Sequence, residues 1–87
     1  MTVYMVDRDL PGIAMEDLAS AQRRAIATAG TMQGQGKPVS YIRSVFVPGE
    51  SHCMCLFEAT TADLVAELND LAEIPYTRIT EALDLTP

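Results

Sequence analysis

Apolar and polar residues alternate at the start of the chain and then change to helical spacing. Residues 2–9 carry β-branched and aromatic side chains in alternation and are followed by Leu10-Pro11-Gly12, so we predict a first strand there. From residue 15 to 31 the apolar side chains recur at helical intervals, with acidic residues in the first turn, and this pattern predicts a helix. The stretch 31–38 has glycines and a proline without periodicity, so we expect a connecting loop.

The rest of the chain predicts a hairpin, a second helix and a last strand. Residues 39–47 and 52–59 have strand patterns, and Pro48-Gly49-Glu50-Ser51 between them is typical of a tight turn. A threonine cap at residues 60–61 precedes apolar residues at helical spacing, and this helix should end before Pro75. Residues 76–85 alternate again, as in a half-buried strand.

The order of these elements is strand, helix, strand, strand, helix, strand. This is the split β-α-β arrangement, which predicts an α+β fold of the ferredoxin-like kind: a four-stranded antiparallel sheet with two helices on one face. We find no linker or internal repeat, so residues 1–87 are expected to form a single domain. One face of the sheet should then lack a covering layer.

The predicted turn sorts the hairpin side chains onto two faces. If Gly49 and Glu50 centre the turn, residues whose numbers sum to 99 lie opposite each other and point to the same side. We predict that Ile42, Ser44, Phe46, Cys53, Cys55 and Phe57 pack beneath the helices. The open face then collects Tyr41, Arg43, Val45, Val47, His52, Met54, Leu56 and Glu58. An apolar face of this kind favours association, so we expect a homodimer, formed by sheet-to-sheet contact or as an edge-joined barrel.

Composition narrows the choice of partners. Twelve acidic and six basic residues give a formal charge of −6, which repels phosphate backbones and anionic lipids, so neither nucleic acid nor a membrane is an expected partner. No stretch approaches the roughly 18 consecutive apolar residues of a spanning helix. The first residues do not resemble an export signal, and we expect a cytoplasmic protein.

The string His52-Cys53-Met54-Cys55 offers the clearest candidate chemistry. Imidazole, thiolate and thioether groups together suit Ni, Cu, Zn or Co. Alternation along one strand prevents all four from meeting one ion, so the candidate metal ligands are His52, Glu50 in the turn, and Cys53 if the strand end is exposed. The alternative is that the cysteines are free, small core residues and that His52 is a solvated residue near the turn.

A second hypothesis places a pocket on the open sheet face. Tyr41, Arg43 and Glu58, with His52 nearby, could line a small-molecule site able to move a proton, in a dimeric α/β-barrel-like binding protein or enzyme. The alternative is that these residues form polar pairs across a dimer interface. The chain has no phosphate-binding glycine loop, metalloprotease helix motif or nucleophile elbow, so a role without catalysis is favoured, and a purely structural module remains a third option.

Three segments resemble a family of short bacterial proteins described as nickel-responsive. They are the acid-Arg-acid-apolar-Pro-Gly start at residues 6–12, the Cys-x-aromatic-x-Ala strand at 55–59, and residues 74–79 after the second helix. The resemblance covers nearly the whole chain and implies a ferredoxin-like fold, a homodimer and Ni(II) binding or sequestration in a metal-stress response. Family members often have a histidine where this chain has Leu68, and a Gly-Phe-Pro where it reads Glu73-Ile74-Pro75.

Overall fold

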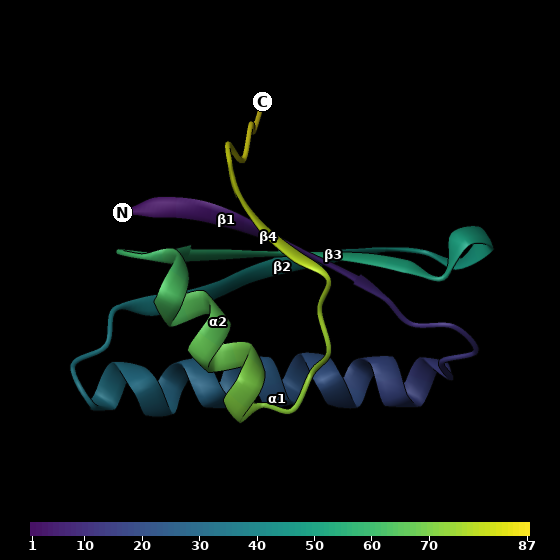
Figure 1. Cartoon of the computed structure of the whole chain (residues 1–87), viewed down its shortest axis with the longest axis horizontal. Helices are drawn as coiled ribbons and strands as arrows, with labels where there is room; N and C mark the ends of the chain where they lie inside the picture. Colours follow the sequence, from purple (N-terminus) through teal and green to yellow (C-terminus); the bar gives the residue numbers. More distant parts are fainter.

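A computed structural model describes all 87 residues of the chain, Met1–Pro87. Its elements are β1 (Thr2–Asp9), α1 (Met15–Gly34), β2 (Val39–Val47), the short 3-10 turn η1 (Pro48–Glu50), β3 (His52–Ala59), α2 (Ala62–Leu71) and β4 (Arg78–Ala82). The strands form one antiparallel sheet in the order β2-β3-β1-β4, and both helices lie on the same side of it (Figure 1). The predicted ferredoxin-like α+β fold is confirmed.

Helix α1 is longer than the sequence pattern predicts. It continues to Gly34 and ends where Gly36 adopts a left-handed conformation with a φ of 79°. The amide of Lys37 donates to the carbonyl of Met32, and the amide of Gly36 to that of Gln33, which satisfies carbonyls of the last turn. The glycines in the predicted loop therefore belong to the end of the helix and its cap.

Strand β4 is shorter than predicted. It ends at Ala82, because β1, the only strand beside it, begins at Thr2 and pairs Val3 with Ala82. Beyond this pair the chain turns away from the helices (Figure 1). Leu83 and Leu85 are therefore 84% and 86% exposed, although their alternation with polar residues resembles that of a strand.

The core lies between the sheet and the two helices. Thr61 caps α2 as predicted, since its side chain accepts a hydrogen bond from the amide of Leu64. The fully buried side chains of the core include Val6, Met32, Val39, Phe57, Val65 and Leu68. Neither helix is long and apolar enough to cross a bilayer.

The hairpin has the predicted register next to its turn and a different one farther away. From the pair Val47–His52 to the pair Arg43–Leu56, the numbers of opposite residues sum to 99, as predicted. A β-bulge between Tyr41 and Arg43 then leaves Ile42 without a cross-strand partner, and Tyr41 lies opposite Phe57. The extra residue reverses the alternation of the strand from that point on.

The bulge corrects two predictions, since Ile42 does not pack against the core and Tyr41 changes face. Tyr41 does not lie on the open face but beneath α1, where its ring packs edge-on against that of Phe57 with centroids 5.5 Å apart. Its hydroxyl accepts a hydrogen bond from Gln22 of α1. The cysteines and Phe57 are buried on the helix side of the sheet, as predicted.

Candidate functional site

A histidine between two aspartates forms a polar cluster on the open face of the sheet. Asp7 and Asp9 lie two residues apart on β1 and therefore point to the same side. Antiparallel pairing puts Asp9 directly opposite His52 of β3. The Nε2 atom of His52 lies 2.9 Å from Asp7 Oδ1, and its Nδ1 atom lies 3.1 Å from Asp9 Oδ1. Each edge of the imidazole ring thus faces one carboxylate.

The two carboxylates differ in environment. The side chain of Asp7 is only 8% exposed, and its second oxygen lies 3.4 Å from the Arg78 guanidinium of β4. Its backbone carbonyl accepts hydrogen bonds from both the amide and the hydroxyl of Thr77. Asp9, in contrast, is 65% exposed. Asp7 is thus a fixed part of the sheet, whereas Asp9 faces solvent.

The aspartates favour the charged form of His52. Hydrogen bonds to Asp9 and then to Asp7 raise the pKa of His52 above its ordinary value, and desolvation opposes them only in part. Because carboxylates only accept hydrogen bonds, both contacts are satisfied when the two ring nitrogens carry protons. Above the raised pKa, one ring nitrogen becomes free to bind a metal.

The structure does not assemble the predicted metal ligands His52, Glu50 and Cys53. Cys53 is 2% exposed on the helix side of the sheet, whereas His52 points to the open side. Glu50 lies in η1, exposed, and forms no hydrogen bond or ion pair with His52. The residues that do meet His52 are Asp7 and Asp9, and sequence analysis missed them. The alternation of Asp7 and Asp9 on β1 puts them on one face, but only the register of β1 with β3 shows that they meet His52.

The predicted open-face pocket is not assembled either. Arg43 is exposed and forms an ion pair with Asp84, which follows β4. Glu58 lies opposite Ser40 and Val3 in the sheet, and Tyr41 lies on the helix side. The bulge at Ile42 thus separates Tyr41 from the other two residues of the proposed pocket.

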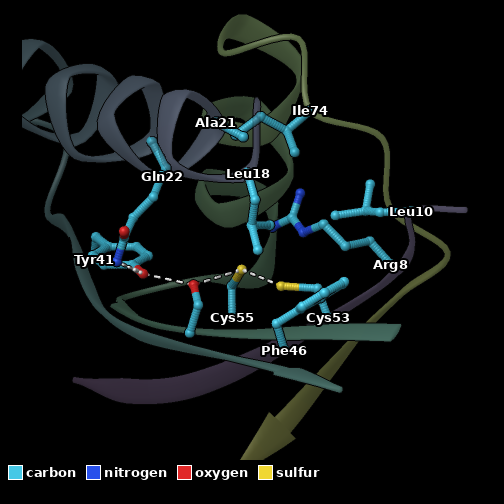
Figure 2. A pocket seen from close by; sticks show the side chains of 12 residues that line it. Arg8, Leu10, Leu18, Ala21, Gln22, Tyr41, Phe46, Cys53, Cys55 and Ile74 are labelled. Carbon is cyan, nitrogen blue, oxygen red and sulfur yellow. Dashed lines mark hydrogen bonds between the residues drawn. The ribbon is translucent and has the colours of Figure 1, made fainter. Parts of the chain in front are cut away.

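A second polar cluster lines a cavity of about 160 Å³ between α1 and the sheet (Figure 2). Hydrogen bonds run in sequence from Gln22 to Tyr41 at 2.9 Å, from Tyr41 to Ser44 at 2.6 Å and from Ser44 to Cys55 Sγ at 3.0 Å. The sulfur of Cys53 lies 3.8 Å from that of Cys55. Four side chains therefore form a line of polar contacts that reaches Cys55, beside the apolar wall of the cavity.

Arg8 brings a buried positive charge to the same cavity. It is 2% exposed, and its guanidinium donates to the carbonyl oxygen of Pro75 at 3.2 Å and to Asn69 Oδ1 at 2.9 Å. Its Nε has no hydrogen-bond partner, and no carboxylate forms an ion pair with it. A buried cation without an anionic partner is costly, so Arg8 favours the charged form of a thiol that lines the same cavity.

The two thiols have opposite tendencies. The contact with Cys53, the charge of Arg8 and the hydrogen bond from Ser44 together lower the pKa of Cys55 to about 6, against the effect of burial. The same contact and burial raise the pKa of Cys53. These contacts therefore favour the charged form at Cys55 rather than at Cys53.

These features define a small ferredoxin-like α+β protein with a histidine–aspartate cluster on its open face and a cysteine–arginine cluster beneath its helices. The chain belongs to the family of nickel-responsive proteins described as SCO4226-like, whose family model matches residues 4–82. The crystal structure of SCO4226 from Streptomyces coelicolor A3(2) has a similar fold, with a TM-score of 0.80 and 19% identity over 97% of this chain and 99% of that one. No curated protein sequence matches the chain.

Proposed function

We propose that this protein binds Ni(II) as a homodimer and sequesters it, with His52 Nδ1 and Asp9 as ligands on the open face. The observation that supports the proposal is the contact of His52 with one buried and one exposed carboxylate, in a chain whose family is nickel-responsive. Imidazole and carboxylate ligands suit Ni(II), and the net charge of −6 favours attraction of a cation.

Asp7 and Asp9 have different roles in this proposal. Histidines that bind metals usually donate their other ring N–H to a carboxylate, which fixes the tautomer and the orientation of the ring. Asp7 is suited to that role, because it is buried and already held by Arg78. Asp9 is suited to be a ligand, because it is exposed.

A single chain does not supply a complete coordination shell. No three or more His, Cys, Asp or Glu side chains converge on one point, since Asp7 and Asp9 face opposite edges of the ring. Water or a second copy of the chain must provide the remaining ligands. The proposed homodimer would supply some of these ligands from its second subunit.

The open face provides a reason for two copies to meet there. Both helices cover the other face of the sheet, and Val45 on the open side is 53% exposed (Figure 1). The exposed Leu83 and Leu85 follow β4 in the segment that extends away from the helices. Apolar surface of this kind is typical of interfaces, and two-fold pairing is the commonest form of self-association.

A calorimetric titration of the purified chain with NiCl2 tests the site. It is carried out at a pH above the raised pKa of His52. We expect saturable binding that His52→Ala abolishes and that Asp9→Asn weakens at least about tenfold. Glu50→Gln and Cys53→Ser test the two other ligands predicted from the sequence, and both should leave the affinity unchanged. Equal binding by the His52→Ala variant would overturn the proposed site.

Sedimentation with and without Ni(II) tests the dimer separately. We expect a dimer, more stable with the metal present, because an ion held between two subunits binds only the associated form. A monomer at all concentrations, with or without metal, would contradict the homodimer.

A further inference from the structure

We infer that Cys55 is a peroxide-reactive thiolate, and that the cavity beneath α1 admits hydrogen peroxide or a small alkyl hydroperoxide to its sulfur. This activity is separate from the proposed nickel site, because it uses the opposite face of the sheet. It rests on three observations: the direction of the hydrogen bonds that reach Cys55, the uncompensated charge of Arg8, and the space beside the sulfur.

The hydrogen bonds from Gln22, Tyr41 and Ser44 run toward Cys55. The side-chain nitrogen of Gln22 only donates, so the Tyr41 hydroxyl accepts from it and donates its own proton to Ser44. Ser44 in turn donates to Cys55 Sγ. The Cys53 sulfur lies 3.8 Å from that of Cys55 (Figure 2), and its S–H can donate to Cys55 when Cys55 is a thiolate. A thiolate at Cys55 would accept from both Ser44 and Cys53, and this is the arrangement that stabilises a thiolate.

Arg8 supplies the matching charge. In Figure 2 its guanidinium lies in the cavity on the same side as the two sulfurs. Both of its hydrogen bonds go to neutral oxygens, and its Nε has none. A thiolate at Cys55 balances this buried cation without any carboxylate. Arg8 lines the same cavity, where its positive charge favours the anion that leaves during reaction.

The cavity fits a small substrate. Its volume of about 160 Å³ is several times the roughly 30 Å³ that one water molecule occupies in the liquid. Hydrogen peroxide has only two heavy atoms, so it fits beside Cys55, and the apolar side chains of Leu18, Phe46 and Ile74 leave room for a short alkyl group. Larger electrophiles would have to displace α1.

The reaction is a two-electron oxidation. The Cys55 sulfur attacks the terminal oxygen of the hydroperoxide, so that an S–O bond forms as the O–O bond breaks. Sulfur is oxidised to the sulfenic acid, the peroxide is reduced, and the alkoxide or hydroxide that leaves takes a proton from water. A low-pKa thiolate beside a second cysteine is the usual setting of this chemistry.

The pH dependence identifies the reacting group. The titratable groups facing Cys55 are Arg8 from β1, Tyr41 from β2 and Cys53 from β3, and α1 contributes only the uncharged Gln22 among its polar side chains. Because these contacts lower the pKa of Cys55 to about 6, the oxidation rate should reach half its maximum near that pH. An ordinary thiol would do so near about 8.5.

In the test, the full chain is treated with a small molar excess of hydrogen peroxide in the presence of dimedone, which traps sulfenic acid. Peptide mass spectrometry then locates the dimedone adduct. We expect the adduct on Cys55 in the wild type and in Cys53→Ser, whose hydroxyl keeps a donor at that position. Ser44→Ala should shift the pH of half-maximal rate upward by about one unit, since it removes a donor to the charged sulfur. Arg8→Met should shift the pH of half-maximal rate further upward, because it removes the positive charge. Arg8→Lys keeps that charge and should therefore give a smaller upward shift.

Two results would overturn the inference. One is an adduct divided evenly between the two cysteines, and the other is a pH profile that Ser44→Ala leaves unchanged. Ser44 is half-buried and not part of the apolar core, so this variant keeps the test valid if Arg8→Met does not fold. His52→Ala is the matched control on the other face: it should leave the peroxide reaction unchanged while it removes nickel binding.

Discussion

Arg8 of β1 donates a 2.9 Å hydrogen bond to Asn69 of α2, and both side chains are buried. Asn69 is oriented for this contact, because its own amide donates to the carbonyl oxygen of Val65 at 2.8 Å. The contact joins the sheet to the second helix and satisfies one donor of a buried cation. The guanidinium thus connects the core packing to the cysteine cluster.

Replacement of Asn69 by Leu should therefore destabilise the protein strongly. The substitution keeps the volume but leaves a charged donor of Arg8 without an acceptor, which costs on the order of 2–3 kcal/mol. Urea unfolding measures the change in free energy. Leu71→Ala, at a 61% exposed position of the same helix, is the control and should change stability by less than about 0.5 kcal/mol. Similar losses in both variants would contradict the assigned role of Asn69.

Glu73→Gly should stabilise the protein. Glu73 has a φ of 58° in a Schellman motif, in which the amide of Ile74 donates to the carbonyl of Asn69 and that of Glu73 to Asp70. Glycine adopts this left-handed conformation without strain, so we expect a gain of about 1 kcal/mol. Thermal unfolding measures it. Glu73→Ala removes the same charge but keeps the Cβ atom, and it should give no comparable gain.

The charge of His52 should make stability depend on pH. Its pKa is raised in the folded protein, so its contribution is fully present below the unfolded value of about 6.5 and is lost as pH rises through the folded pKa. Urea unfolding at several pH values, compared with His52→Gln, should show this loss. NMR titration should show that Asp9→Asn lowers the pKa of His52, whereas Asp84→Asn, which breaks the ion pair with Arg43, leaves it unchanged.

Deletion of Ile42 should be tolerated. Ile42 is the extra residue of the bulge, so its removal leaves Tyr41 on the helix side and regularises the strand, with a loss of about 1–2 kcal/mol for its half-buried side chain. Deletion of Ser44 is the matched control, because it moves Arg43 into the helix-facing position opposite Cys55 and should unfold the protein. Circular dichroism and urea unfolding distinguish the two outcomes. Equal damage from both deletions would argue against the bulge.

The sequence predicted the elements and most of the hairpin because both depend on local periodicity. Strands β2 and β3 have the predicted bounds, and Cys53, Cys55 and Phe57 face the helices as expected. The bulge at Ile42 carries no local signal, since neither glycine nor proline marks it, and the position of Tyr41 was wrong for that reason. A one-residue insertion changes every side chain beyond it.

The polar clusters depend on pairing between distant segments, which periodicity does not reveal. His52 meets Asp7 and Asp9 only through the register of β1 with β3, and Arg8 meets Asn69 across 61 residues of sequence. The sequence motif around Arg8 was visible, but its burial beside the cysteines was not. Local patterns therefore predicted the candidate residue His52, while its neighbours required the fold.

Asp7 and Arg8 are consecutive residues of β1, and the sheet separates their side chains. Asp7 contacts the imidazole on one side, while Arg8 lines the cavity with the thiolate on the other. A slip of this strand by a single position would exchange the acid and the base between the two compartments and destroy both at once. Any ligand that stabilises the register of β1 on one face therefore also stabilises the arrangement of side chains on the other.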